Sequence, residues 1–397
     1  MSVFRRYADV LAPDGAAAAL TASVVGRVSL GTTGLAVLLL ARHTTGSYAV
    51  AGAVSASYAV SLALAAPGRA RAADRSGPVR VLVVCGVLNA AALCGFVVLA
   101  ATGSGGVLLC LGAVVAGLTV PPVGAVMRAL WGELASGPAL TSAYSLESVV
   151  VELCFVLGPL LVAGLTAVSG PSLPVLASAA LSGTGSLWLA GVPRLREVRP
   201  HEGRPVRRAG PLVSAAVRSL LLTVLWIGAG FGAIEVAVPA FAEQHGSRPG
   251  TGGVLLAVWS FGSILGGLAY GARQPRAQPH RQLPILVALL TVGTLLPLLA
   301  GSIVALGVCL VAYGSTVAPF STCNSVLLGR SAPAGTTTEA FAWNGSMIFG
   351  GAAAGSAVAG LLVEAYGATA GLAVTAGAGL LTLGCSVAGL PALRRAA

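Results

Sequence analysis

The chain has 397 residues, of which 56% are hydrophobic and only 9% are charged. A water-soluble domain carries about a quarter charged residues, so this composition excludes a soluble globular fold and indicates an integral membrane protein. The net charge of +11 comes from Arg without any Lys, and these arginines lie in alternate loops, which indicates membrane topology and argues against a nucleic-acid partner.

Apolar stretches of membrane-spanning length recur along the whole chain. A hydrocarbon core about 30 Å thick needs about 20 residues per helix, so a chain of this length can supply about twelve spans with short loops. We expect spans at 16–41, 48–67, 79–101, 105–127, 143–167, 172–192, 219–241, 251–272, 283–300, 302–328, 338–363 and 368–390. The sequence therefore predicts an all-α integral membrane fold with twelve transmembrane helices.

The placement of arginine orients these spans. With the N-terminus in the cytoplasm, the outer loops hold only Arg42 and Arg248, whereas the inner segments hold nearly all the others. Residues 1–15 lack the continuous apolar region of a signal peptide and are expected to form a short cytoplasmic tail. This bias predicts a multi-pass protein of the cell membrane with both termini in the cytoplasm.

The longest polar stretch, Pro193 to Pro211, divides six predicted spans from six. It carries several arginines, as a solvated cytoplasmic linker that fixes orientation would. We therefore expect an N-terminal six-helix bundle at 1–192, a linker at 193–213 and a C-terminal six-helix bundle at 214–397.

The two halves are repeats of each other. An ungapped shift of 197 residues superposes the fourth and fifth spans on the tenth and eleventh. Matched pairs are Gly117 with Gly314, Thr119 with Thr316, Val120 with Val317, Pro122 with Pro319, Gly132 with Gly329 and Thr141 with Thr338. A parallel repeat of this kind predicts a central site where the halves face each other.

The loop between the second and third spans reads Ala70-Arg71-Ala72-Ala73-Asp74-Arg75-Ser76-Gly77-Pro78-Val79-Arg80. It resembles a signature of the major facilitator superfamily, which is Gly, three residues, Asp, Arg, one residue, Gly and a basic pair. Asp74, Arg75 and Gly77 match in type and spacing. Ala70 replaces the leading Gly, and Arg80 alone stands for the basic pair.

This resemblance covers nearly the whole chain and implies the family's fold, two six-helix bundles related by a pseudo-two-fold axis. It also implies alternating access, in which the bundles rock about the central site. For the loop it implies a gate whose acid, Asp74, joins a charge network and faces a helix N-terminus of the other half. Arg75, Gly77 and Arg80 take the accompanying gate positions.

Prolines mark two helices for distortion or close packing. Gly158-Pro159 in the fifth span resembles the Gly-Pro core of a signature associated with antiporters in this family, which favours export. Such a pair is also typical of a kink or of close helix contact. Pro121-Pro122 is expected to bend the fourth span, with Pro122 at the repeated position.

Ionisable residues inside spans are the candidates for transport chemistry, because a charge at the bilayer centre costs about 2.5–3.5 kcal/mol on insertion scales. Arg27, Glu147, Glu152 and Glu235 lie within spans one, five and seven. We expect Glu152 and Glu235, with Glu147, to couple transport to protons, and Arg27 to hold one of them ionised or to bind an anionic part of the substrate. A static buried ion pair is the alternative.

Further polar and aromatic residues are candidates for the cavity or the gate. Glu339, like Glu147, lies near the cytoplasmic end of its span, where gating and helix capping are both expected roles. The uncharged candidates for the substrate cavity are Thr119, Trp226, Trp259, Asn324, Trp343 and Asn344. Asn89 on the third span is expected to be peripheral.

The sequence has no Walker A motif and no metal-binding spacing of Cys or His, so we expect no ATPase, no metal and no cofactor. We expect a secondary transporter, working as a monomer, that exports a small amphiphilic or drug-like molecule or metabolite in exchange for protons. Proton-coupled symport of a sugar or similar nutrient is the first alternative. A membrane-embedded enzyme or a sensor is the second, although the sequence shows neither clustered catalytic side chains nor an appended soluble domain.

Overall fold

The computed structural model describes residues 10–197, 210–246, 251–273 and 278–396, and these ranges contain helices and no strand. The first half comprises α2 (Ala16–Thr45), α3 (Tyr48–Ser76), α4 (Pro78–Ala101), α5 (Gly106–Thr119), α6 (Val123–Leu134), α7 (Gly137–Ser169), α8 (Ser172–Gly191) and α9 (Pro193–Glu197). The second comprises η1 (Gly210–Val213), α10 (Ala215–Gln244), α11 (Thr251–Arg273), α12 (Pro279–Leu295), η2 (Leu296–Leu299), α13 (Ile303–Ser331), α14 (Thr337–Tyr366) and α15 (Ala368–Ala396).

Twelve helical segments within the described ranges are long and apolar enough to cross a membrane, which confirms the predicted spans. α5 and α6 together form the fourth span, and α12 with η2 forms the ninth. Several helices extend past the predicted limits, since α3 continues to Ser76 and α7 begins at Gly137. Arginine is a good helix former but a poor membrane-core residue, so hydropathy does not mark the arginine-rich end of α3.

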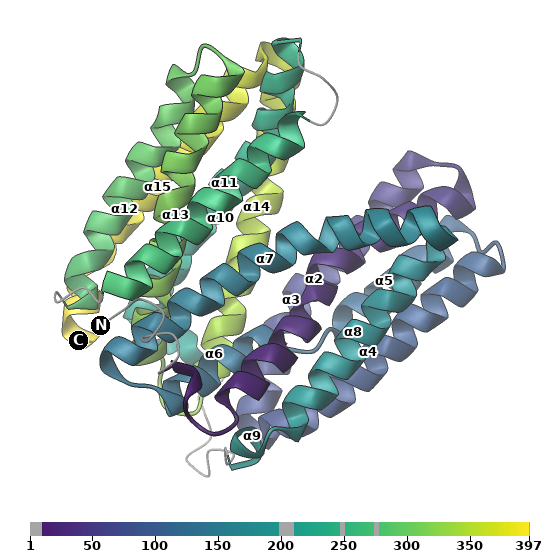
Figure 1. Ribbon diagram of the computed structural model, residues 1–397, viewed down its shortest axis with the longest axis horizontal. Coiled ribbons are helices and arrows are strands. Elements are labelled where there is room, and N and C mark those ends of the chain that lie inside the picture. Colours follow the sequence, from purple (N-terminus) through teal and green to yellow (C-terminus); the bar gives the residue numbers. More distant parts are fainter. Residues whose placement is uncertain (1–9, 198–209, 247–250, 274–277, 397) are drawn as a thin grey trace.

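The helices form two bundles with matching arrangements (Figure 1). The helix ends Ser76, Leu134 and Ser169 lie 197 residues before the helix ends Arg273, Ser331 and Tyr366. In both bundles the first helix packs against the fifth and sixth, as α2 does against α7 and α8. The shift found in the fourth and fifth spans therefore extends to the second. Of the predicted linker, residues 198–209 lie outside the described residues, as do residues 1–9 of the predicted N-terminal tail.

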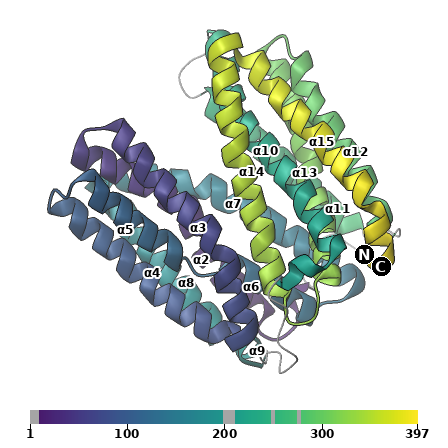
Figure 2. The same cartoon turned by 180° about the vertical axis from the view of Figure 1, so that it is seen from behind.

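The two bundles meet at one side of the molecule, which we call the base, where α2 begins and α15 ends. Contacts between bundles join α3 to α14, α7 to α11 and α13, and α6 to α14. They involve the last turns of α3 and the first turns of α7 and α14. From the base the bundles diverge, as the front and back views both show (Figures 1 and 2).

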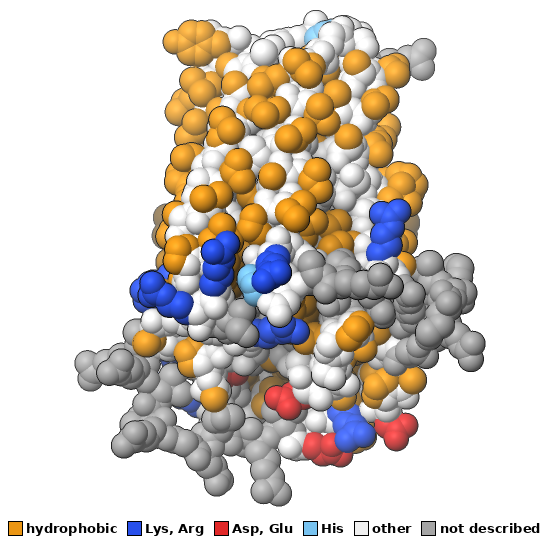
Figure 3. All heavy atoms as spheres, turned by 90° about the vertical axis from the view of Figure 1, so that its left-hand side faces the viewer, with side chains coloured by type: hydrophobic (Ala, Val, Ile, Leu, Met, Phe, Trp, Pro, Cys, Tyr) orange, Lys and Arg blue, Asp and Glu red, His pale blue; other side chains and the backbone are white. Residues whose placement is uncertain are grey.

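Charge is distributed unevenly between the base and the rest of the surface. On the face drawn in Figure 3, hydrophobic side chains cover the upper part and arginine side chains form a belt below them. Last turns at the base contain Arg75, Arg273, Arg330, Arg394 and Arg395. A belt of cations at one end of an apolar surface is the arrangement expected at the edge of a bilayer.

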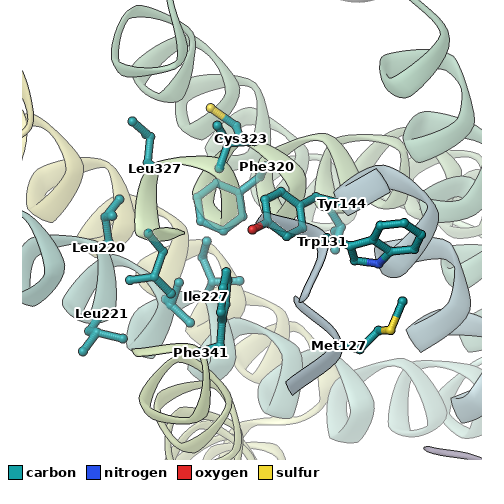
Figure 4. Packing of buried hydrophobic residues seen from close by; sticks show 14 of the residues in the cluster. Met127, Trp131, Tyr144, Leu220, Leu221, Ile227, Phe320, Cys323, Leu327 and Phe341 are labelled. Atoms are coloured by element: carbon teal, nitrogen blue, oxygen red, sulfur yellow. The ribbon is translucent and has the colours of Figure 1, made fainter. Parts of the chain in front are cut away.

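A hydrophobic cluster extends from the second bundle into the base between the bundles, and Figure 4 shows part of it. Tyr144 of α7 points toward Phe320 of α13 and Phe341 of α14, and the ring centroids of Tyr144 and Phe341 are 5.8 Å apart. Trp131 of α6 is fully buried in the same cluster. Aromatic packing therefore closes the base beside the polar groups described below.

Proline has different effects on three spans. The fourth span is interrupted at Val120–Pro122 between α5 and α6, where the sequence predicted a bend. α13 continues through Pro319 and α7 continues through Pro159. Two consecutive prolines remove two successive N–H donors from a helix, whereas one proline removes one, so the break is confined to the fourth span.

Candidate functional site

The best-buried charges of the first bundle form an ion pair. Arg27 of α2 and Glu147 of α7 have side-chain exposures of 6% and 1%, and Arg27 Nη2 lies 2.5 Å from Glu147 Oε2. The same Nη2 donates to the carbonyl oxygen of Gly124 in α6 at 3.2 Å. Three helices therefore meet at one guanidinium.

α6 adds two more groups to this pair. Trp131 Nε1 donates to Glu147 Oε1 at 3.0 Å, and Arg128 Nε lies 4.0 Å from Glu147 Oε2. Two guanidiniums thus share one carboxylate. Nε and Nη1 of Arg27 have no hydrogen-bond partner among the described residues. With Glu147 ionised, the cluster keeps a net positive charge.

Arg128 and Trp131 are missing from the candidates drawn from the sequence. Hydropathy ends the fourth span at residue 127, which places both residues in a cytoplasmic loop. The helix instead continues to Leu134. The available signal was their spacing of three residues, which puts an arginine and a tryptophan on one helical face next to the apolar segment.

Glu152 lies one and a half turns beyond Glu147 on α7, at the contact between bundles. Its Oε1 accepts a hydrogen bond of 2.9 Å from Ser263 Oγ of α11, and the side chain is half-buried. Where α2 packs against α7, Glu147 lies next to Arg27. Arg27 therefore pairs with Glu147 and not with Glu152. Glu152 is instead a polar link between the halves.

Glu235 on α10 stands apart from both groups. It is exposed, and no other described residue forms a hydrogen bond or ion pair with it. One turn earlier, Phe231 makes an edge-to-face contact with Trp259 of α11, with centroids 5.2 Å apart. Gly230 and Ala237, on the opposite side of the helix, contact α15. Glu235 therefore lies on the face of α10 directed away from the outer helix α15.

Two of the uncharged candidates bond to each other, and one of them lies at the position equivalent to Glu147. Asn324 Nδ2 of α13 donates to Asn344 Oδ1 of α14 at 2.9 Å, and both side chains are buried. Asn344 follows Glu147 by 197 residues. The second bundle thus has a neutral amide, paired with Asn324, where the first has the carboxylate of Glu147.

The remaining uncharged candidates are dispersed. Trp259 lies between Phe231 and Tyr313, whereas Trp343 donates to Glu339 at 3.4 Å. Trp226 is half-buried on α10. Thr119 lies at the break between α5 and α6, where it accepts a hydrogen bond from Asn89 at 3.3 Å.

The predicted gate loop contacts the second bundle. Asp74 accepts hydrogen bonds from the backbone N–H groups of Thr338 and Glu339, at 3.1 and 2.9 Å, at the start of α14. A carboxylate is stabilised there by the helix dipole and by free N–H groups. Glu339 in turn accepts two hydrogen bonds from Arg71, at 2.8 and 2.5 Å. We call this set, Arg71, Asp74 and Glu339, the charged contact.

Arg71 was not among the predicted gate residues, although it lies three residues before Asp74 and so on the same helical face. Arg75 and Arg80 are exposed and form no hydrogen bond or ion pair with another described residue. Gly77 has φ of 89° and forms the turn between α3 and α4. The signature spacing thus points to Asp74, whereas Arg71, which binds Glu339, occupies one of the three positions that the signature leaves unspecified.

A second, uncharged contact occupies the equivalent place between α7 and α11. Ser142 Oγ donates to the carbonyl oxygen of Gly271 at 3.0 Å, and Ser145 Oγ to that of Gly267 at 2.5 Å. Ser142 precedes Glu339 by 197 residues, and Gly271 follows Asp74 by the same number. We call this pair of bonds the serine contact.

The described ranges contain no group of three or more His, Cys, Asp or Glu side chains arranged to hold a metal ion. The polar groups that converge at the base are instead guanidiniums, carboxylates, hydroxyls and amides. Such groups bind and release protons or bind a charged or hydrogen-bonding solute.

Comparison with known proteins identifies relatives of the fold. The model of the Major Facilitator Superfamily matches residues 19–338. No curated protein matches the chain. A solved structure of the human organic anion transporter MFSD10 (TETRAN) is 18% identical, with a TM-score of 0.72 over 93% of this chain and 99% of that one.

Two further solved structures are similar. An outward-facing bacterial homologue of the iron transporter ferroportin is 14% identical, with a TM-score of 0.80 over 94% of this chain and 98% of that one. The proton:xylose symporter XylE is 12% identical, with a TM-score of 0.68 over 92% and 94% of the two chains. At these identities the likeness establishes a shared fold.

Proposed function

Since the chain belongs to the major facilitator superfamily, we propose that it is a cell-membrane transporter that exports a small amphiphilic molecule or metabolite in exchange for protons. It works by alternating access, as a monomer. The observation that carries this proposal is the cluster of two guanidiniums on one buried carboxylate, one and a half turns from a second acid that bridges the bundles.

The base corresponds to the cytoplasmic side. The arginines in the last turns of α3, α11, α13 and α15 support this orientation through the positive-inside rule. The bundles meet at the base and diverge from it, so the conformation is outward-open with the cytoplasmic gate closed. Export then requires the charged contact and the serine contact to separate so that substrate can enter from the cytoplasm.

Glu152 is the proton carrier that we favour. Its ionised carboxylate accepts the Ser263 hydrogen bond across the bundles, and bonds to an ionised acceptor are about twice as strong as neutral ones. A proton arriving from the open side neutralises Glu152, weakens its hold on α11 and favours opening of the base. Glu235 lies on the inward face of α10 and is the second candidate for this step.

Arg27 and Glu147 prepare the substrate site. The pair is neutral in itself, and Arg128 adds a second positive charge. The two guanidiniums together carry one positive charge more than Glu147 balances, and an anionic group on the substrate restores the balance. Arg27 thus pairs with Glu147 in one step and binds substrate in another, while Asn324 and Asn344 offer hydrogen bonds from the second bundle.

Proteoliposomes with an imposed pH gradient test the proposal. A panel of anionic, neutral and cationic amphiphiles is screened for movement against the proton gradient, and Glu152→Gln and Glu235→Gln are compared with Glu364→Gln, an exposed acid on α14. We expect exchange for protons that is lost in Glu152→Gln and kept in Glu364→Gln. Uptake in the same direction as protons would identify a symporter, and full activity in both Glu152→Gln and Glu235→Gln would exclude these acids as proton carriers.

A further inference from the structure

The break in the fourth span leaves backbone carbonyl groups without their helical partners. In an uninterrupted helix, the N–H groups of residues 121 and 122 would bond to the carbonyl oxygens of Gly117 and Leu118. Both positions are proline and have no N–H. An unpaired carbonyl within a membrane costs several kcal/mol, so another donor is required.

Arg69 of α3 supplies that donor. Its Nη1 bonds to the carbonyl oxygens of Gly117 and Leu118 at 2.9 and 2.5 Å, and its Nη2 bonds to that of Leu62 in its own helix at 3.2 Å. No carboxylate of the described residues lies within ion-pair distance of Arg69. The guanidinium therefore acts on the backbone, at the C-terminal end of α5, where a cation is favoured by the helix dipole.

The neighbouring carbonyl is covered in the same way. Asn89 Nδ2 of α4 donates to the carbonyl oxygen of Ala116 at 2.8 Å. Gly117 lets α3 approach α5 closely enough that a Cβ at this position would collide with Ser61 and the Tyr58 backbone. Side chains of α3 and α4 thus donate hydrogen bonds to three successive carbonyl oxygens before the break, those of residues 116–118.

The second bundle shows a different solution at the equivalent place. Gly266 lies 197 residues after Arg69, and Ser315 lies 197 residues after Leu118. α13 contains only Pro319 at this point and stays continuous. The backbone of α11 at Gly266 packs directly on the Ser315 carbonyl that Pro319 leaves without an N–H partner, with no room for a Cβ. Arg69 is thus specific to the bundle whose helix is broken.

We propose that Arg69 is a positioning residue that couples the gate to the buried ion pair by bracing the break in the fourth span. It lies on α3 two residues before Arg71 and five before Asp74, which bind α14. Beyond the break, α6 carries Arg128 and Trp131 onto Glu147. When α3 moves to open the base, the Arg69 bonds make the C-terminal end of α5 move with it. The short connection at 120–122 passes this movement to α6 and so changes the surroundings of Glu147.

A double-mutant cycle tests the brace. The double substitution Pro121→Ala and Pro122→Ala supplies two backbone N–H groups that can bond to the carbonyl oxygens of Gly117 and Leu118. In that background, Arg69→Met should lower the stability less. We expect Arg69→Met alone to lower the unfolding temperature by several degrees, and to lower it by less than half as much in the Ala-Ala background. Arg69→Lys keeps the positive charge but not the planar set of guanidinium N–H donors, so its unfolding temperature should lie between those of wild type and Arg69→Met. An equal loss in both backgrounds would overturn the proposal.

Hydrogen–deuterium exchange tests the coupling without any substrate. Asp74→Asn weakens the charged contact, and we expect it to raise exchange both at 337–346, which Asp74 touches, and at 123–134 in α6. When Arg69→Met is combined with Asp74→Asn, the increase in exchange at 337–346 should persist, and the increase at 123–134 should fall at least about threefold. An unchanged response of α6 would show that Arg69 braces the helix without coupling it.

A transport assay then measures the consequence, and this readout alone rests on the proposed function. Arg69→Met should reduce kcat about tenfold or more with a smaller change in KM, because the residue does not touch the substrate site. If the exchange experiment succeeds and no transport is found for any variant, the proposed substrate or direction is wrong and the coupling stands. A change in KM with kcat preserved would contradict the role of Arg69.

Discussion

Glu147 is the residue on which the charge balance of the first bundle depends. It accepts a hydrogen bond from Trp131 and faces Arg27 at 2.5 Å and Arg128 at 4.0 Å. Removing one member of a buried ion pair leaves the other uncompensated, which is more costly than replacing both. The two members of this pair are unequal, because one carboxylate serves two guanidiniums.

Glu147→Gln should therefore destabilise the protein more than Arg27→Met. The first leaves the buried Arg27 and the 15% exposed Arg128 without a counter-charge, at a cost of about 3–5 kcal/mol. The second leaves Arg128 beside Glu147 to replace the lost partner. Thermal unfolding in detergent compares the two variants with the double variant. Equal losses would mean that Arg128 does not share the carboxylate, and a double variant as stable as wild type would mark the pair as dispensable for folding.

Arg71 and Arg75 differ in what they contact, although they lie one turn apart on α3. Arg71 makes the two-bond contact with Glu339, whereas Arg75 is exposed and touches no described partner. Arg71→Met should slow transport about tenfold or more, while Arg75→Met should stay within about twofold, because an exposed charge contributes little. Initial rates in proteoliposomes measure both. A larger loss of transport rate in Arg75→Met than in Arg71→Met would show that Arg75, the arginine of the signature, is the gate residue.

At the scale of helices, the sequence was informative about what a helix contains and less so about how it is rotated. Apolar length predicted all twelve spans, and matched Pro and Thr residues predicted the repeat. The partner of Arg27 was not predictable, because it depends on the face that α2 presents to α7. Arg128 and Trp131 were missed for another reason, since hydropathy could not show that the helix continues through them.

Gly158 shows how closely two helices of the first bundle approach. A Cβ there would lie 2.5 Å from the Gly31 backbone, so Gly158→Ala must push α2 and α7 apart. We expect a loss of about 1–3 kcal/mol in unfolding free energy. Gly164→Ala, in the same helix but facing open space, should be neutral or stabilising by up to about 1 kcal/mol. Chemical unfolding measures the change in unfolding free energy of each variant. Equal changes would mean that helix propensity, and not packing, determines the effect of the added Cβ.

At the scale of the whole molecule, the two halves share their helix arrangement, apart from the break in the fourth span, and differ in their chemistry. The charged contact and the serine contact occupy equivalent places between the bundles. Glu147 and Asn344 are likewise equivalent, and so are Arg69 and Gly266. Buried charge is thus confined, among the described residues, to the first bundle and to one of the two contacts. Opening of the base should accordingly be controlled through α3 and α14, with the serine contact following.

Cysteine accessibility at the serine contact measures that order. Ser142 is 1% exposed in the closed base, so a cysteine placed there, with the seven natural cysteines replaced by alanine, should react slowly with a maleimide applied from the base side. Asp74→Asn, which acts on the other contact, should raise this rate at least about tenfold by shifting the population toward the open base. Ser76→Cys, exposed at the base, serves as the control and should react rapidly in both backgrounds. If Asp74→Asn leaves the Ser142→Cys rate unchanged, the two contacts open independently and the bundles do not move as rigid bodies.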